Sequence, residues 1–151
     1  MKTSLRAFLP LVAALALAAC DGEDGGNSIS GTFDGDEVDG PVDATAILDN
    51  QFLDVILTTQ IRVADPKDGS ELRLTISVDL SREIRLGEPL PVGTGGAVSA
   101  TVVRADQPQR SGAGTVQFDV LDAEPGGTVA GDFDLSFNAA RLRGSFDTTV
   151  E

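Results

Sequence analysis

Apolar residues recur at every second position along most of this chain, which is the period of a β-strand with one buried face. In residues 71–80 the even positions are all Leu, Ile or Val, and the odd positions are all polar or charged. Residues 53–63 show the same alternation at their odd positions, interrupted only by Thr59. Between these runs, residues 65–70 contain a Pro, which presets a turn φ, and a Gly, which accepts a positive φ. The pattern predicts a long β-hairpin.

Six weaker runs with the same period cover the rest of the domain. They are residues 29–33, 42–48, 98–102, 116–120, 129–137 and 142–150. Segments rich in Gly or Pro precede three of them, at residues 87–96, 111–114 and 124–127. No segment shows a convincing helical period. About eight strands joined by such turns predict an all-β fold, an antiparallel β-sandwich or barrel.

A short motif, Gly-x-Phe-Asp, occurs three times, at residues 31–34, 131–134 and 144–147. One hypothesis is that the motif is a repeated binding element. The alternative is structural: each Phe points into the core, and each Gly marks a place where the strand bends or a neighbour packs close. The short distance between the last two copies predicts a hairpin near the C-terminal end of the chain.

The N-terminal residues follow a different pattern. Lys2 and Arg6 precede an apolar run, residues 8–19, that is broken only by Pro10. Twelve helical residues rise about 18 Å, whereas the hydrocarbon core of a bilayer needs about 20 residues. The run is therefore too short for a permanent transmembrane helix and has the length of a signal-peptide core.

This apolar run ends in Leu17-Ala18-Ala19-Cys20, and Cys20 is the only cysteine of the chain. The four residues resemble the lipobox of bacterial lipoproteins, in which Leu and two small residues precede the Cys. The resemblance implies cleavage between Ala19 and Cys20, and attachment of a diacylglyceryl group and a fatty acyl chain such as palmitate to Cys20. The alternative is an ordinary secretory leader, which would leave a free thiol at the mature N-terminus.

The lipoprotein interpretation divides the chain into three parts. Residues 1–19 are the signal peptide, residues 20–28 are the lipidated cysteine with a flexible acidic tether, and residues 29–151 are a single β domain. The tether is Gly-rich, polar and without periodicity, which is typical of a flexible linker. The resemblance implies a bacterial cell membrane, with the domain facing the periplasm or the exterior, and leaves open whether the membrane is inner or outer.

Charge gives the domain an acidic surface. The chain carries 11 Lys and Arg against 24 Asp and Glu, and cleavage before Cys20 would remove Lys2 and Arg6 but no acid. The mature chain would then hold 9 basic and 24 acidic residues, a formal net charge of −15. Such a surface repels nucleic acid and anionic lipid headgroups, and it attracts cations or basic partners.

The residue types argue against catalysis. The absence of His, Trp and Tyr removes imidazole bases and ligands, and the usual aromatic platforms for sugars. Lys67 is the only Lys after the leader, and an exposed Lys is a poor base at neutral pH. No Gly-x-Ser-x-Gly nucleophile elbow occurs. We expect a protein that is not an enzyme; a hydrolase built on two carboxylates is the less favoured alternative.

Residues 34–40 are the strongest candidate for a metal site. They contain four acids, Asp34, Asp36, Glu37 and Asp39, together with two Gly. Calcium prefers six to eight oxygen ligands from carboxylates, carbonyls and water. The spacing does not match an EF-hand loop, which places ligands at its fifth and twelfth positions. The segment is either a calcium site or an acidic turn between two strands, and the residue types predict no other cofactor.

The function that these features favour is a membrane-anchored bacterial lipoprotein. Its non-enzymatic β domain would have a structural role, or bind another protein of the cell envelope through loops or an exposed strand edge. The alternative is a small-ligand module that binds calcium or encloses an apolar ligand in a barrel.

Overall fold

A computed structural model describes residues 26–61, 71–105 and 107–151. These residues form ten β-strands and no helix, which confirms the predicted all-β class. In chain order the strands are β1 (Ser28–Phe33), β2 (Asp36–Asp49), β3 (Phe52–Gln60), β4 (Glu71–Asp79), β5 (Pro89–Val92), β6 (Val98–Arg104), β7 (Arg110–Ser111), β8 (Ala113–Leu121), β9 (Thr128–Phe137) and β10 (Ala140–Thr149).

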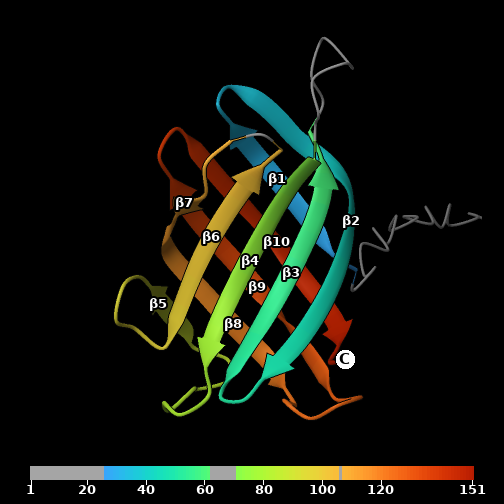
Figure 1. Cartoon of the computed structure of the whole chain (residues 1–151), viewed down its shortest axis with the longest axis vertical. Helices are drawn as coiled ribbons and strands as arrows, with labels where there is room; N and C mark the ends of the chain where they lie inside the picture. Colours follow the sequence, from blue (N-terminus) through green and yellow to red (C-terminus); the bar gives the residue numbers. More distant parts are fainter. Residues whose placement is uncertain (1–25, 62–70, 106) are drawn as a thin grey trace, which may run out of the picture.

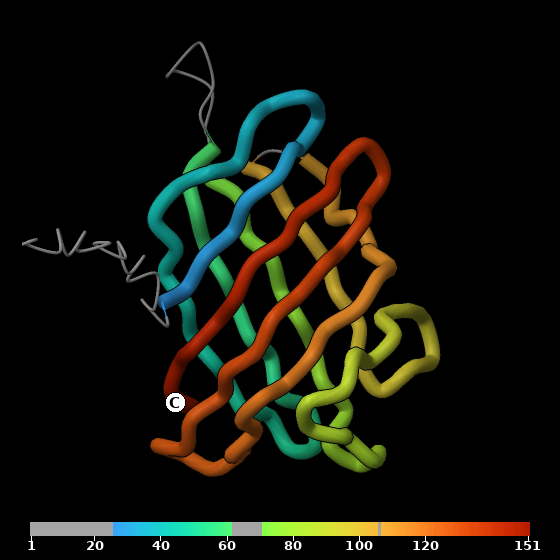
Figure 2. Tube along the Cα trace, turned by 180° about the vertical axis from the view of Figure 1, so that it is seen from behind, coloured from blue at the N-terminus to red at the C-terminus, as the bar shows by residue number. Residues whose placement is uncertain are grey.

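All ten strands belong to one hydrogen-bonded sheet, in the order β4-β3-β2-β1-β10-β9-β8-β5-β6-β7. β4 also pairs with β6, so the series of pairings leads back to the strand where it began. Figure 1 shows β3, β4 and β6 in front of β8, β9 and β10, and Figure 2 shows the same two layers from behind. The apolar faces of the two layers meet in the core.

The strand count and the strand directions differ from the prediction. The pattern predicts about eight antiparallel strands, whereas the described residues contain ten, and the sheet is mixed because β5 and β6 pair in parallel at Val92 and Val98. The strands missed are β5 and β7. β5 was not predicted because it contains Pro89 and Pro91, and proline, which donates no backbone hydrogen bond, argues against a strand in a sequence pattern. β7 has two residues, too few to show a period.

Two segments predicted as turns are extended instead. β2 begins at Asp36, so residues 36–41 pair with β1 rather than forming a loop. Residues 111–114 lie mostly in β7 and β8. The Gly-rich residues 93–96 and the turn at residues 124–127 are connections between strands, as predicted.

The hairpin predicted from the two clearest runs is confirmed by β3 and β4, which pair antiparallel along their whole lengths. The inward Leu, Ile and Val side chains of both strands are buried. Thr59, which interrupts the pattern, is buried as well, and its hydroxyl donates to the carbonyl of Pro41 at 2.9 Å. This hydrogen bond offsets the cost of burying a polar group. The predicted turn at residues 65–70 lies outside the described residues.

The Gly-x-Phe-Asp motif has a structural role in the β9–β10 hairpin. Its second and third copies lie side by side on the antiparallel strands β9 and β10. Gly131 is therefore opposite Phe146, and Phe133 is opposite Gly144. Both phenylalanine rings are buried. A Cβ added to Gly144 would overlap the backbone oxygen of Ser28 on β1 and would lie 2.8 Å from Cζ of Phe133, so both the neighbouring strand and the ring need a glycine here. The predicted C-terminal hairpin and inward-facing rings are confirmed.

Candidate functional site

The candidate calcium residues lie at and after the turn between β1 and β2. Asp34 and Gly35 form this turn with φ values of 53° and 89°. Two successive positive φ values are typical of a type I′ turn, which favours Asp-Gly and matches the twist of the flanking strands. The backbone N–H of Asp34 donates to the carbonyl of Ala139 at 3.0 Å. The turn therefore lies against the β9–β10 turn at the same end of the sheet.

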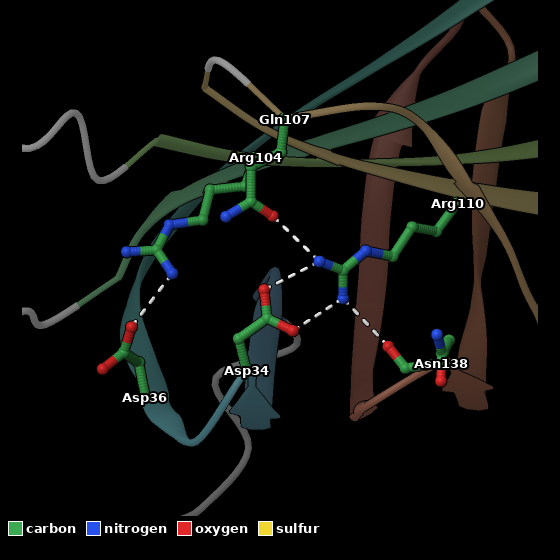
Figure 3. Close-up of polar contacts among 6 residues, drawn as sticks. All are labelled: Asp34, Asp36, Arg104, Gln107, Arg110 and Asn138. Atoms are coloured by element: carbon green, nitrogen blue, oxygen red, sulfur yellow. Dashed lines mark hydrogen bonds and ion pairs between the residues drawn. The ribbon is translucent and has the colours of Figure 1, made fainter.

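Arg110 binds Asp34 through both nitrogens of its guanidinium group (Figure 3). Nη1 and Nη2 donate to the two carboxylate oxygens of Asp34, each at 2.7 Å. Nη1 also donates to the carbonyl of Asn138, and Nη2 to the side-chain oxygen of Gln107, both at 2.9 Å. The guanidinium carbon lies 4.6 Å from the centre of the Phe33 ring, a cation–π contact. One side chain thus joins the β1–β2 turn, the β9–β10 turn and the β6–β7 connection.

A second ion pair lies beside the first. Nη1 of Arg104, at the end of β6, donates to Oδ2 of Asp36, at the start of β2, at 2.9 Å. The Arg104 side chain is only 12% exposed, so surrounding protein shields this pair from much of the solvent. β2 and β6 are not neighbours in the sheet, and the pair therefore links strands that have no backbone hydrogen bonds to each other. We call these side chains, with the Asn138 carbonyl, the arginine cluster: Asp34, Asp36, Arg104, Gln107, Arg110 and Asn138.

The arginine cluster holds Asp34 in its ionised form. The hydrogen bond from Arg110 lowers the pKa of Asp34 below its ordinary value of 3.8, desolvation opposes this, and the charges of Arg110 and Arg104 lower it further. Asp34 in turn raises the pKa of Arg110. A carboxylate held in this way accepts hydrogen bonds and does not exchange protons near neutral pH. The Asp34–Arg110 pair is therefore suited to fastening the end of the sheet rather than to acid–base chemistry.

Replacing Asp34 with asparagine is expected to make the melting temperature depend less on pH in the acid range. Because the pKa of Asp34 is lowered on folding, its ion pair stabilises the protein fully above the unfolded pKa, and this contribution is lost as pH falls through the folded pKa below 3.8. The melting temperatures of wild type and variant should differ most near neutral pH and converge in acid. Circular dichroism melts from about pH 2 to pH 7 measure this difference.

The matched control for this experiment is Asp132→Asn, because Asp132 makes no ion pair among the described residues. Its melting temperature should stay close to that of wild type throughout. A Tm difference between wild type and Asp34→Asn that stays constant with pH would show that the ion pair does not contribute in the way the geometry indicates.

The other two candidate ligands, Glu37 and Asp39, do not join the arginine cluster. Strand alternation puts Asp36 on the same face as the buried Val38, and puts Glu37 and Asp39 on the opposite, exposed face. In the described residues, no group of three or more Asp, Glu, Cys or His side chains is arranged to hold a metal ion. The calcium hypothesis stays a prediction, and the placement of these four acids gives it no support.

The remaining predicted site lies outside the described part of the chain. Ala19 and Cys20, the proposed cleavage and lipidation residues, and Lys67 are not among the described residues. Within the described ranges, no helix has the length and apolar character that crossing a membrane requires.

Among the described residues, the carboxyl groups whose pKa values shift all have a lowered pKa. Hydrogen bonds from Arg141, and less strongly the charge of Arg143, lower the pKa of Asp134, and a hydrogen bond from Ser81 lowers that of Asp79. The general acid of a glycoside hydrolase needs a raised pKa instead. These shifts give no support to the alternative of a carboxylate hydrolase.

Ion pairing leaves the outer surface negative. Every arginine among the described residues pairs with a carboxylate: Arg73, Arg82, Arg85, Arg104, Arg110, Arg141 and Arg143. Many described acids have no such partner: Glu37, Asp39, Asp43, Asp49, Asp54, Asp119, Asp122, Glu124, Asp132, Asp147 and Glu151. Each arginine of this part therefore has a carboxylate partner, although Arg141 and Arg143 share Asp134, and the described acids outnumber the described bases.

The sequence carries no local signal for the basic half of the arginine cluster. Arg104 and Asp36 are 68 positions apart, and Arg110 and Asp34 are 76 positions apart. Because acidic residues far outnumber basic ones in this chain, each arginine is expected to pair with a carboxylate. The carboxylate with which an arginine pairs depends on the order of the strands in the sheet, and hydrophobic periodicity does not predict that order.

Comparison with known proteins identifies no relative of this chain: no family model matches it, and no curated protein and no solved structure shows significant similarity to it. The fold defines the class of this protein: a single-sheet all-β domain with ion pairs at one end of the sheet and an excess of acidic residues.

Proposed function

We propose that this protein is a lipid-anchored, non-enzymatic domain of the bacterial cell envelope that binds a basic partner protein through its acidic outer surface. The observation that carries the proposal is the charge balance of the described residues: each described arginine has a carboxylate partner, with Asp134 shared by Arg141 and Arg143, while many described carboxylates pair with no described base. Opposite charge on a partner would speed encounter and select against acidic competitors.

The proposal includes a closed barrel as the form of the sheet. The pairing of β4 with β6 supports closure, since it joins β4, at one end of the sheet order, to β6, which is next to last at the other end. Apolar side chains from both layers pack together in the core, with Leu57, Leu74 and Val116 fully buried. A core filled in this way favours recognition at the outer surface over an apolar ligand held inside.

The proposed anchor is Cys20, and its support is the lipobox at residues 17–20. Two or more acyl chains hold a protein at a membrane without a transmembrane helix. Cys20 is eight residues before Ser28, the first residue of β1, and eight extended residues span at most about 28 Å. A domain anchored in this way stays near the membrane, where it can meet another envelope protein.

The experiment that tests the proposal compares wild type with Cys20→Ala in cells. Wild type is expected to incorporate labelled palmitate, to sediment with membranes, and to crosslink to one dominant basic envelope protein. Cys20→Ala should lose the label completely and should lose most of the crosslinked product, because the thiol that receives the lipid is gone. Scintillation counting and mass spectrometry of the crosslinked product give the two readouts.

A Ser28→Ala variant serves as the control that leaves the lipobox intact, and it should behave as wild type in both readouts. Uptake of palmitate by Cys20→Ala would show that the lipobox interpretation is wrong. Normal labelling of wild type without any partner above the Cys20→Ala level would instead favour a small-ligand module, to be sought by melting screens with calcium and lipids.

A further inference from the structure

Two large apolar side chains lie exposed on the outer face of β2 and β3. Ile47 is 42% exposed and Phe52 is 45% exposed. The strand register places Ile47 opposite Asp54, with Phe52 and Ile56 as its diagonal neighbours. Diagonal neighbours lie about 7–8 Å apart, within reach of aromatic and long side chains. Ile47, Phe52 and the half-buried Ile56 form what we call the β2–β3 patch.

The fold does not require apolar residues at these positions. The inward faces of β2 and β3 are supplied by other residues, such as Ala46, Leu53 and Val55, which are fully buried. A single exposed apolar residue is ordinary, whereas adjacent large ones point to a surface that another molecule covers.

On β2 and β3, the neighbours of the β2–β3 patch include carboxylates that pair with no described base, whereas on its β4 side Phe52 lies opposite Asp79, which pairs with Arg82. Asp49 lies directly opposite Phe52, and Asp54 lies directly opposite Ile47. Asp43 faces outward further along β2, opposite Thr58. None of these three acids pairs with a described base, although Asn50 donates a hydrogen bond to Asp49 at 3.2 Å. The patch therefore offers apolar contact and negative charge in the same small area.

The combination of apolar side chains and carboxylates favours a basic polypeptide over an anionic membrane surface as the molecule that covers the patch. A membrane surface with anionic headgroups would be repelled by Asp49 and Asp54. The two described bases next to the patch, Arg73 and Arg82, are each paired with a carboxylate, Glu71 and Asp79. A polypeptide that carries apolar residues flanked by Lys or Arg meets both requirements, since its apolar side chains cover Ile47 and Phe52 while its basic side chains approach the carboxylates.

We propose that the β2–β3 patch, with Asp49 and Asp54, is the docking surface for a basic amphipathic segment of a partner protein. The inference rests on the proposed function and adds to it the place and the kind of contact. The exposed Leu86 and Val120 are not part of this surface: Val120 is on β8, and Leu86 follows Arg85, which pairs with two glutamates.

A defined probe tests the proposal on the full-length, lipidated protein in detergent. The probe is a fluorescently labelled synthetic helix of Leu and Lys with one apolar face, and its matched counterpart has Glu in place of every Lys. Anisotropy titrations should show binding of the Leu/Lys helix, weakening with salt, and no binding of the Leu/Glu helix. Two double variants, Ile47→Thr with Phe52→Thr and Asp49→Asn with Asp54→Asn, should each weaken binding about tenfold or more.

Threonine and asparagine keep the changes at the surface, and a melting curve identifies any variant that fails to fold. The control variants are Leu86→Ser with Val120→Thr, which removes exposed apolar groups elsewhere, and Asp132→Asn with Asp147→Asn, which removes charge elsewhere. Both controls should bind the Leu/Lys helix within about twofold of wild type.

The possible results distinguish failure of the proposed function from failure of the β2–β3 patch as its binding site. Failure of wild type to bind the Leu/Lys helix at low salt would overturn the acidic-surface function itself. Binding that survives both patch variants, or that falls mainly in the Asp132 and Asp147 control, would leave the function standing and overturn the β2–β3 patch as its site. Patch-dependent binding to phosphatidylglycerol vesicles, without binding of the helix, would assign the patch to a membrane and overturn the proposal.

Discussion

Gly31→Ala is expected to destabilise the protein by about 3 kcal/mol or more. Gly31 has a φ of +139°, a region that L-residues rarely adopt. A Cβ on Gly31 would also overlap the backbone oxygen of Arg141 on the paired strand β10. A small shift of the Arg141 backbone cannot relieve the overlap at low energetic cost, because β10 is itself held by hydrogen bonds in the sheet.

Two other glycines separate these causes. Gly35 has a φ of +89°, but an added Cβ would meet no atom within 4 Å, so Gly35→Ala should cost only about 1–2 kcal/mol from backbone strain. Gly93 has neither a positive φ nor a close neighbour, so Gly93→Ala should lie within about 0.5 kcal/mol of wild type.

Urea denaturation followed by far-ultraviolet circular dichroism measures all three free energies, since the chain has no Trp or Tyr to report by fluorescence. The order Gly31, Gly35, Gly93 is the expected ranking of the losses. A loss for Gly31→Ala no larger than that for Gly35→Ala would show that β1 and β10 do not approach each other as closely as described.

The parts of the fold that the sequence predicts correctly are those with a local cause. The alternation in residues 71–80 specifies β4 and its buried face, because successive side chains on a strand point to opposite sides. The Gly-x-Phe-Asp copies on β9 and β10 are readable for the same reason: an inward Phe and an inward Gly, two residues apart, are positions of one face.

The parts that periodicity misses depend on contacts between distant segments. β5 is a strand because β8 and β6 lie on either side of it, although its own residues, Pro-Leu-Pro-Val, have no strand period. The interpretation of residues 34–40 as a calcium loop or an acidic turn fails to include Arg104 and Arg110, which lie on β6 and β7, strands that do not pair with β1 or β2. Hydrophobic period indicates which face is buried, whereas ion-pair partners are set by strand order.

Replacing Phe146 with alanine is expected to cost about 3–5 kcal/mol. The side chain is 1% exposed and lies opposite Gly131, which has no side chain to fill the space that the ring would leave. Phe146 also packs edge-on against Phe118, with ring centres 5.6 Å apart and planes at 62°. Phe146→Leu should lose less, because it keeps most of the volume and gives up mainly the aromatic contact, worth about 0.5–1.5 kcal/mol.

Phe52→Ala is the matched control, because it removes the same group from a side chain that is 45% exposed. Its free energy of unfolding should lie within about 0.5 kcal/mol of wild type, while its affinity for the Leu/Lys helix falls. Phe146→Leu, in contrast, should lower stability and leave that affinity unchanged. If Phe52→Ala destabilised the protein as much as Phe146→Ala, Phe52 would be part of the core, and the exposed apolar surface from which the docking site is inferred would not exist.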